Sequence, residues 1–242
     1  MRSAILTYHS VDGSGSIISV TPDLFRRQMQ TLVERRVPVI PLDRILAGNT
    51  GVALTFDDGY QNFADAALPV LIEFHLSATV FVVSGLCGSL GTWKSAPGIP
   101  RLPLMHWNTV RQLPANLITL GSHSVSHPDL TRISGDNVAV ELHDSRREIE
   151  DRTGRPVSLL AYPYGSVNAA VRAAAQRDYA MSCGTQLNYL GAEPDGFDLP
   201  RVDTYYLREA AWFEKVVTGG GQTYLGVRRF LRNVRRASSP GW

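Results

Sequence analysis

Two pairs of residues in this chain have the types and the spacing that metal-assisted hydrolysis requires. Asp57 and Asp58 are adjacent carboxylates in LTFDDG, and His123 and His127 lie four residues apart in GSHSVSH. That spacing brings two imidazoles to one face over a single helical turn, and Pro128 predicts that the turn stops there. Catalytic zinc commonly takes three protein ligands and keeps one position open, so one carboxylate could complete the set. Taken singly, the pairs also fit solvated loop acids and capping histidines.

The elements that must position these residues alternate along the chain. Short apolar, β-branched runs predict strands at 4–8, 37–40, 52–56, 77–85, 116–124, 158–165 and 180–185. Helical patterns fall at 25–36 (after the cap-like Thr21-Pro22-Asp23), 64–75, 106–114, 135–153 (ended by Gly154) and 168–179. About seven strands alternating with helices predict a parallel α/β sheet or a (β/α) barrel.

Polar residues follow four of the predicted strands. His9 follows 4–8, Asp57 and Asp58 follow 52–56, His123 ends 116–124, and a Tyr-Pro-Tyr-Gly turn ends 158–165. In barrels of this kind reactive groups collect at the carboxyl ends of the strands, because the βα loops form one rim there. We therefore expect these side chains to converge on one site.

Composition excludes several classes of protein. No apolar stretch approaches the roughly 20 residues of a membrane span, and the apolar run before His9 is too short for a signal peptide, which predicts a cytoplasmic protein. Two cysteines in no metal-binding pattern indicate neither a disulfide framework nor a cysteine zinc site. Basic residues do not spread over a working face, so we expect no nucleic-acid partner.

The arginines concentrate near the C-terminus. The net charge is +2, yet 228–236 alone holds five arginines and is followed by no acid. We divide the chain into a catalytic domain at 1–225 and a basic helix or tail at 226–242. An amphipathic helix there, with Leu225, Phe230, Leu231 and Val234 opposing the arginines, fits a solvated helix or a peripheral contact with an anionic inner membrane.

Three motifs together resemble a known family. TFDDG, SHSVSH followed by Pro-Asp-Leu, and a later PYG turn are similar to those of the polysaccharide deacetylases, also called the NodB-homology or carbohydrate esterase family 4 domain. The resemblance covers nearly the whole chain, from YHSV to LPRVD. It implies a distorted (β/α) barrel and metal-dependent removal of acyl groups, usually acetyl, from N-acylated sugars.

The resemblance also implies roles for individual residues. Asp58, His123 and His127 match the metal ligands, and Asp57 matches the general base. The backbone N–H of Tyr164 would stabilise the oxyanion, and the turn Pro163, Tyr164, Gly165 would bind substrate.

Two aromatic residues outside the motifs could contact a sugar. Trp107 and Trp93 could line the groove, although a packing role is equally open for both.

The chain departs from the family in two places. The third motif usually carries an arginine that steadies the base, and here it reads Ala-Tyr-Pro-Tyr; Arg201 could supply that guanidinium or could be a surface arginine. The usual C-terminal histidine acid is absent. TYHSV resembles circularly permuted relatives, so His9 is predicted to be the general acid, with Asp203 orienting it, or else a structural histidine.

The predicted function is hydrolysis of N-linked acetyl groups on a sugar in a polysaccharide, oligosaccharide or lipid-linked glycan. Alternatives are the same chemistry on a small-molecule or lipid-linked amide, or a silent carbohydrate-binding protein. Zn²⁺ is the default metal, with Co²⁺, Ni²⁺ and Fe²⁺ compatible with imidazole and carboxylate ligands.

Overall fold

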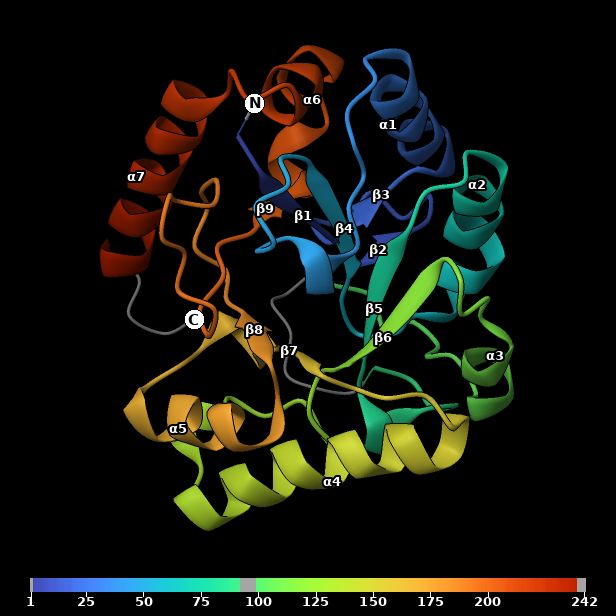
Figure 1. Cartoon of the computed structure of the whole chain (residues 1–242), viewed down its shortest axis with the longest axis vertical. Helices are drawn as coiled ribbons and strands as arrows, with labels where there is room; N and C mark the ends of the chain where they lie inside the picture. The colour runs from blue at the N-terminus through green and yellow to red at the C-terminus, as the bar shows by residue number, and fades with distance from the viewer. Residues whose placement is uncertain (1, 92–98, 239–242) are drawn as a thin grey trace.

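A parallel β-sheet forms the centre of the protein. The computed structural model describes residues 2–91 and 99–238, so Trp93 lies outside the described residues. The sheet has seven strands in the order β8-β7-β6-β5-β4-β1-β9, and every pairing within it is parallel. The strands are β1 (Ala4–Tyr8), β4 (Val52–Phe56), β5 (Ala78–Val82), β6 (Ile118–Ser122), β7 (Leu159–Ala161), β8 (Met181–Cys183) and β9 (Val202–Asp203). The sheet curls into an open half-barrel, which confirms the predicted fold class (Figure 1).

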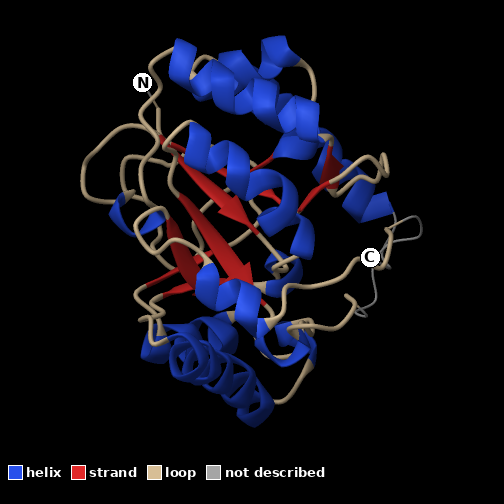
Figure 2. Cartoon of the chain, turned by 90° about the vertical axis from the view of Figure 1, so that its right-hand side faces the viewer, coloured by secondary structure: helices blue, strands red, loops and turns tan. Residues whose placement is uncertain are grey.

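The helices lie around the outside of this sheet (Figure 2). They are α1 (Pro22–Glu34), α2 (Leu68–Glu73), α3 (Trp107–Gln112), α4 (Gly135–Thr153), α5 (Ala169–Asp178), α6 (Ala210–Val217) and α7 (Gln222–Ser238). Local signals fix several of their ends. Thr21 caps α1 by accepting a hydrogen bond from the Leu24 N–H, and Gly154 ends α4 in a left-handed conformation, as the sequence predicted.

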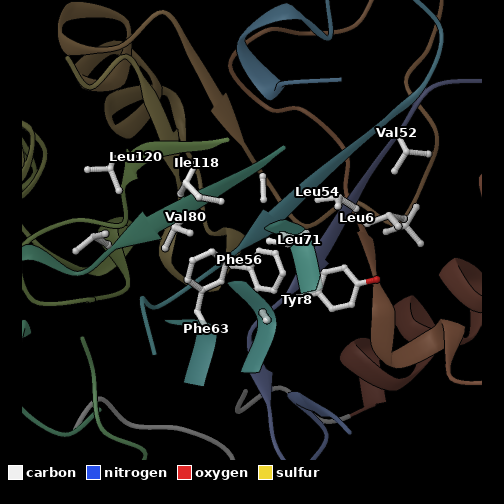
Figure 3. Packing of buried hydrophobic residues seen from close by; sticks show 14 of the residues in the cluster. Leu6, Tyr8, Val52, Leu54, Phe56, Phe63, Leu71, Val80, Ile118 and Leu120 are labelled. Atoms are coloured by element: carbon white, nitrogen blue, oxygen red, sulfur yellow. The ribbon is translucent and has the colours of Figure 1, made fainter. Parts of the chain in front are cut away.

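Residues on both faces of the sheet are buried, which explains the continuous apolar strands. In β1, Leu6 and Tyr8 join the large cluster beneath the helices, whereas Ile5 joins a smaller cluster on the other face. Tyr8 stacks on Phe56 with ring centroids 5.1 Å apart (Figure 3). The two neighbouring strands are thereby locked in register at the ends that carry His9 and Asp57.

Two predicted elements differ from the structure. The strand predicted at 37–40 is wrong: only a single bridge joins Val39 to Val52, because the flanking prolines, Pro38 and Pro41, cannot donate to a ladder. The helix predicted at 64–75 begins as a π-helical turn, Phe63–Ala67, before α2. Pro69 lacks the N–H that a regular α-helical ladder needs there.

Three short strands lie outside the predicted ranges: β9 of the main sheet, and two that form a separate pair. β2 (Ser10–Val11) and β3 (Ser19–Val20) pair in parallel immediately after His9. This pairing holds the two ends of the loop that follows β1 together.

The boundary predicted between 225 and 226 falls inside α7. The helix begins at Gln222, the Leu225 side chain is fully buried, and Tyr224 stacks on Trp212 with centroids 4.0 Å apart. The first turns of α7 therefore belong to the core of the domain. Among the described residues, no helix is both long enough and apolar enough to cross a membrane.

Candidate active site

The carboxyl ends of neighbouring strands bring the predicted residues together. Tyr8 pairs with Phe56 at the ends of β1 and β4, and the Asp57 N–H donates to the Tyr8 carbonyl, so the ladder continues to the first carboxylate. Likewise the His123 N–H donates to the Val82 carbonyl at the ends of β6 and β5. Parallel strands end at one edge, and that edge holds the site.

Asp58, His123 and His127 form a buried cluster. The Asp58 Oδ1 lies 3.5 Å from the Nε2 of each histidine, and the three ligand atoms lie within 4.8 Å of one another. His123 uses its Nδ1 toward the Ala161 carbonyl at 2.7 Å, which directs its Nε2 to Asp58. Such a second hydrogen bond fixes the tautomer and the ring orientation of a metal-binding histidine.

This donor set fits a divalent cation. Metal bonds of 2.0–2.2 Å at tetrahedral angles place neighbouring ligand atoms about 3.4 Å apart, close to the separations between Asp58 and the two imidazoles. Burial lowers the pKa of His127 well below the ordinary value, which keeps its ring neutral as a ligand must be. Burial raises the pKa of Asp58, and the charge of Asp57 adds to this, so a cation would relieve an unfavourable pair.

The segment between the two histidines is not the predicted helical turn. Ser124 and His127 both have left-handed backbones, with φ of 65° and 58°, and the Ser124 hydroxyl accepts a hydrogen bond from the His127 N–H at 3.0 Å. Glu141 on α4 accepts from the N–H groups of Val125 and Ser126, each at 2.9 Å. The two imidazoles converge because this loop folds back, not because they share a helical face.

Arg201 holds Asp57 in a bidentate ion pair. Its two terminal nitrogens lie 2.7 and 2.8 Å from the Asp57 oxygens, and its Nε donates to the Gly184 carbonyl at 2.9 Å. Both side chains are buried, so the alternative of a surface arginine is wrong. Burial would raise the pKa of Asp57, but the Arg201 guanidinium outweighs it and holds that pKa well below the usual range.

The chain path explains how Arg201 reaches the site. Leu199 forms an isolated bridge with Cys183 of β8, and Val202 pairs with Leu6 of β1. The segment therefore crosses the open side of the half-barrel, and Arg201 points inward from it toward Asp57.

His9 lies on the other side of Asp57. Its Nε2 is 3.9 Å from the Asp57 Oδ2, and its side chain is 24% exposed, whereas the side chains of the two aspartates, the two other histidines and the arginine are at most 6% exposed. The structure does not bring Asp203 to it as predicted: the Asp203 carboxylate caps the next turn and accepts from the Tyr205 N–H at 2.8 Å. An imidazole that reaches solvent is thus adjacent to the Asp57 carboxylate.

The PYG turn borders the cluster of Asp58, His123 and His127. Tyr164 has φ of 60° and Gly165 of 69°, and the Gly165 N–H donates to the Tyr162 carbonyl at 2.8 Å. The Tyr164 ring meets the His127 ring edge-on at 4.7 Å and is 41% exposed, whereas Pro163 is buried. This turn places a backbone N–H and an aromatic ring beside the ligands.

Trp107 packs between helices. It lies at the start of α3, against the large core cluster, with the Arg152 guanidinium of α4 5.8 Å from its ring centroid. This matches the packing alternative, and its contact with a sugar stays a prediction.

Two residues of the site were missed by the sequence analysis. Tyr60 is buried and hydrogen-bonds the Asp58 carboxylate, and its place two residues after the aspartates could have indicated it. Glu141, which secures the loop between the histidines, had no local signal, because it is one acid among several on a long helix.

Comparisons with known proteins find similarity to polysaccharide deacetylases and related deacetylases. Residues 47–181 match the family model for polysaccharide deacetylases. The polysaccharide deacetylase homologue YxkH of Bacillus subtilis is 24% identical over 82% of this chain and 70% of its own length. The peptidoglycan-N-acetylglucosamine deacetylase of Listeria monocytogenes is 29% identical over 56% of this chain, which matches a quarter of that protein. A Streptococcus pyogenes deacetylase has a similar fold, with a TM-score of 0.73, 24% identity, and coverage of 84% of this chain and 92% of its own.

Proposed function

The chain belongs to the polysaccharide deacetylase family, and we propose that it is a metal-dependent hydrolase that removes N-acetyl groups from an amino sugar of a glycan. The observation that carries this proposal is that two adjacent carboxylates have different neighbours. Asp58 faces two imidazoles, whereas Asp57 faces a guanidinium and a histidine. One strand end would thereby hold a cation site beside a separate base.

Asp58, His123 and His127 would hold the metal. Zn²⁺ is our first choice, and Co²⁺, Ni²⁺ or Fe²⁺ would suit the same ligands. A bound divalent cation supplies a Lewis acid for the amide carbonyl and lowers the pKa of an attacking water.

Asp57 would accept the proton of that water. The Arg201 fork keeps this carboxylate ionised and fixes its plane, and each oxygen retains a second lone pair. General-base catalysis of this kind contributes about 10²–10⁴-fold, provided that the carboxylate is correctly positioned.

His9 would protonate the leaving amine. Its Nε2 lies 3.9 Å from Asp57, so proton uptake and proton delivery take place on neighbouring atoms. The side chain reaches solvent, from which it can recover its proton.

The Tyr164 N–H would donate to the oxyanion that forms at the acetyl carbon. Removing one such donor typically costs about 10²–10³ in rate. The left-handed backbone at Tyr164 sets the direction of this N–H relative to His127.

An N-acetylglucosamine-containing glycan is the substrate class we favour. Support comes from the Listeria monocytogenes relative, whose name specifies that sugar in peptidoglycan. The partly exposed Tyr164 ring beside the ligands suits the apolar face of a pyranose.

Acetate release from N-acetylglucosamine oligomers tests the proposal. The metal-depleted protein should regain activity with Zn²⁺ or Co²⁺, and metal content should be measured beside activity. Asp57→Asn should keep the metal and lose activity, whereas His123→Ala should lose both. His143→Ala, at a histidine 53% exposed on α4, is the matched control. Unchanged activity in both site variants would refute the assignment.

A further inference from the structure

The last helix, α7, has two faces that differ in what they contact. Toward the domain, Leu225 is buried, Tyr224 stacks on Trp212, and the Arg228 guanidinium lies 6.0 Å from the Tyr206 ring centroid. These contacts fix the rotation of the helix on the domain. The opposite side is therefore held outward.

An apolar stripe occupies that outward side. Val227, Phe230, Leu231 and Val234 are 54%, 66%, 52% and 50% exposed. Their spacing of i, i+3, i+4 and i+7 places them on one helical face. Isolated exposed apolar residues need no explanation, but four in one stripe indicate an interaction surface.

The charge on α7 indicates which partner fits the stripe. The helix carries five arginines and no acid. A repeat of 3.6 residues places Arg228 and Arg235 along one border of the stripe, and Arg229 nearly opposite to it. A second copy of this chain would bring like charges together at this border, whereas anionic phospholipid headgroups would neutralise them.

The same helix lies beside the catalytic turn. Arg229, Arg232 and Asn233 line a recess of about 230 Å³ together with Gly165 and Thr185, and Gly165 directly follows Tyr164. A surface that binds the outer side of α7 is thus close to the rim where substrate must enter.

We propose that α7 docks on an anionic phospholipid bilayer, with the stripe Val227, Phe230, Leu231 and Val234 in the interface and with Arg228 and Arg235 at the headgroups. Docking in this way holds the catalytic rim next to the lipid surface, where a lipid-linked or surface-bound glycan would be reached. The lipid contact does not require the chain to be an enzyme, so the two proposals can fail separately.

Co-sedimentation of the full chain with vesicles tests this proposal. We expect binding to phosphatidylglycerol–phosphatidylcholine vesicles, weakening toward 1 M salt, and much weaker binding to pure phosphatidylcholine. Phe230→Ser should lower the partition coefficient about tenfold, since a phenyl ring leaves the interface. Arg235→Gln should lower it about fivefold on anionic vesicles alone. Val140→Ser, at a valine 55% exposed on α4, is the control and should bind like the parent.

Other outcomes would overturn the proposal. Equal binding to neutral and anionic vesicles, or unchanged binding by Phe230→Ser, would exclude this mode of docking. A concentration-dependent dimer in light scattering that Phe230→Ser dissolves would assign the stripe to a second copy instead. Acetate release from a soluble oligomer should be the same for Phe230→Ser and the parent, which shows that the variant is folded and reports on the enzymatic proposal independently.

Discussion

Arg201→Lys should weaken both the fold and the reaction, because it keeps the charge and removes the fork. The parent side chain makes two hydrogen bonds to Asp57 and one to the Gly184 carbonyl, all in a buried setting. A lysine ammonium can replace one carboxylate contact. The loss of one hydrogen bond to the carboxylate and of one to the carbonyl predicts a decrease of about 2–4 kcal/mol in the free energy of unfolding.

The effect on the reaction follows from the position of the Asp57 carboxylate. With one contact, Asp57 is free to rotate, and a misplacement of about 1 Å at a reacting group costs roughly 10²-fold in rate. We expect kcat to fall ten- to a hundredfold while the metal content stays unchanged, because Arg201 contacts the base and no metal ligand.

Urea unfolding and acetate release, both with excess metal, measure the two effects. Arg172→Lys is the matched control: Arg172 forms a bidentate pair with Asp195, but the two side chains are 34% and 48% exposed, so its loss should cost less than about 1 kcal/mol. The same substitution thus compares a buried fork with an exposed one.

A double-mutant cycle gives the result that would refute the reasoning. If Arg201 acts through Asp57, then Arg201→Lys should cost at least about 1 kcal/mol less in the Asp57→Asn background than in the parent. Equal costs in the two backgrounds, or an effect no larger than that of Arg172→Lys, would show that the ion pair does not organise the base.

Three further predictions concern the surroundings of the metal cluster and the catalytic turn. Glu141→Gln should lower metal affinity about tenfold without unfolding the protein, as metal titration would show, since the loop between the histidines loses a charged acceptor; an unchanged affinity would contradict this role. Tyr60→Phe removes the hydrogen bond to Asp58 and should also weaken metal binding about tenfold, whereas equal affinity would mean that burial alone orients this carboxylate. Gly165→Ala should lower the urea midpoint by an amount corresponding to at least about 1 kcal/mol, because φ is +69° and a Cβ would lie 2.3 Å from the Thr185 hydroxyl oxygen; a midpoint equal to the parent's would show that the turn relaxes.

Most residues of the site lie in short sequence motifs and could therefore be identified from the sequence. Asp57 and Asp58 directly follow an apolar strand, and the PYG turn ends another, so knowing where parallel strands end was enough to place them on one edge. Helix limits set by caps were predictable for the same reason: Thr21 and Gly154 act on their own neighbours. The family, too, could be identified from these short motifs, and the comparisons confirmed it.

Other features depend on residues far apart in the chain. The backbone of the loop between His123 and His127 is left-handed at two residues and is held by Glu141 from a separate helix, so the spacing alone suggested the wrong geometry. Leu225 is buried because α7 packs against the domain, and this helix runs without a break from Gln222 to Ser238, so the division of the chain near 225 stays a prediction.

What the sequence by itself determined is the inventory of the site: the acids, the imidazoles, the turn and the strands that carry them. Only the tertiary structure decided what surrounds Asp57. Arg201 and His9 are 144 and 48 residues from Asp57, and they meet it because β1 lies between β4 and β9 in the sheet. The order of the strands depends on how both faces of the sheet are buried in the folded chain. No short sequence motif predicts that order.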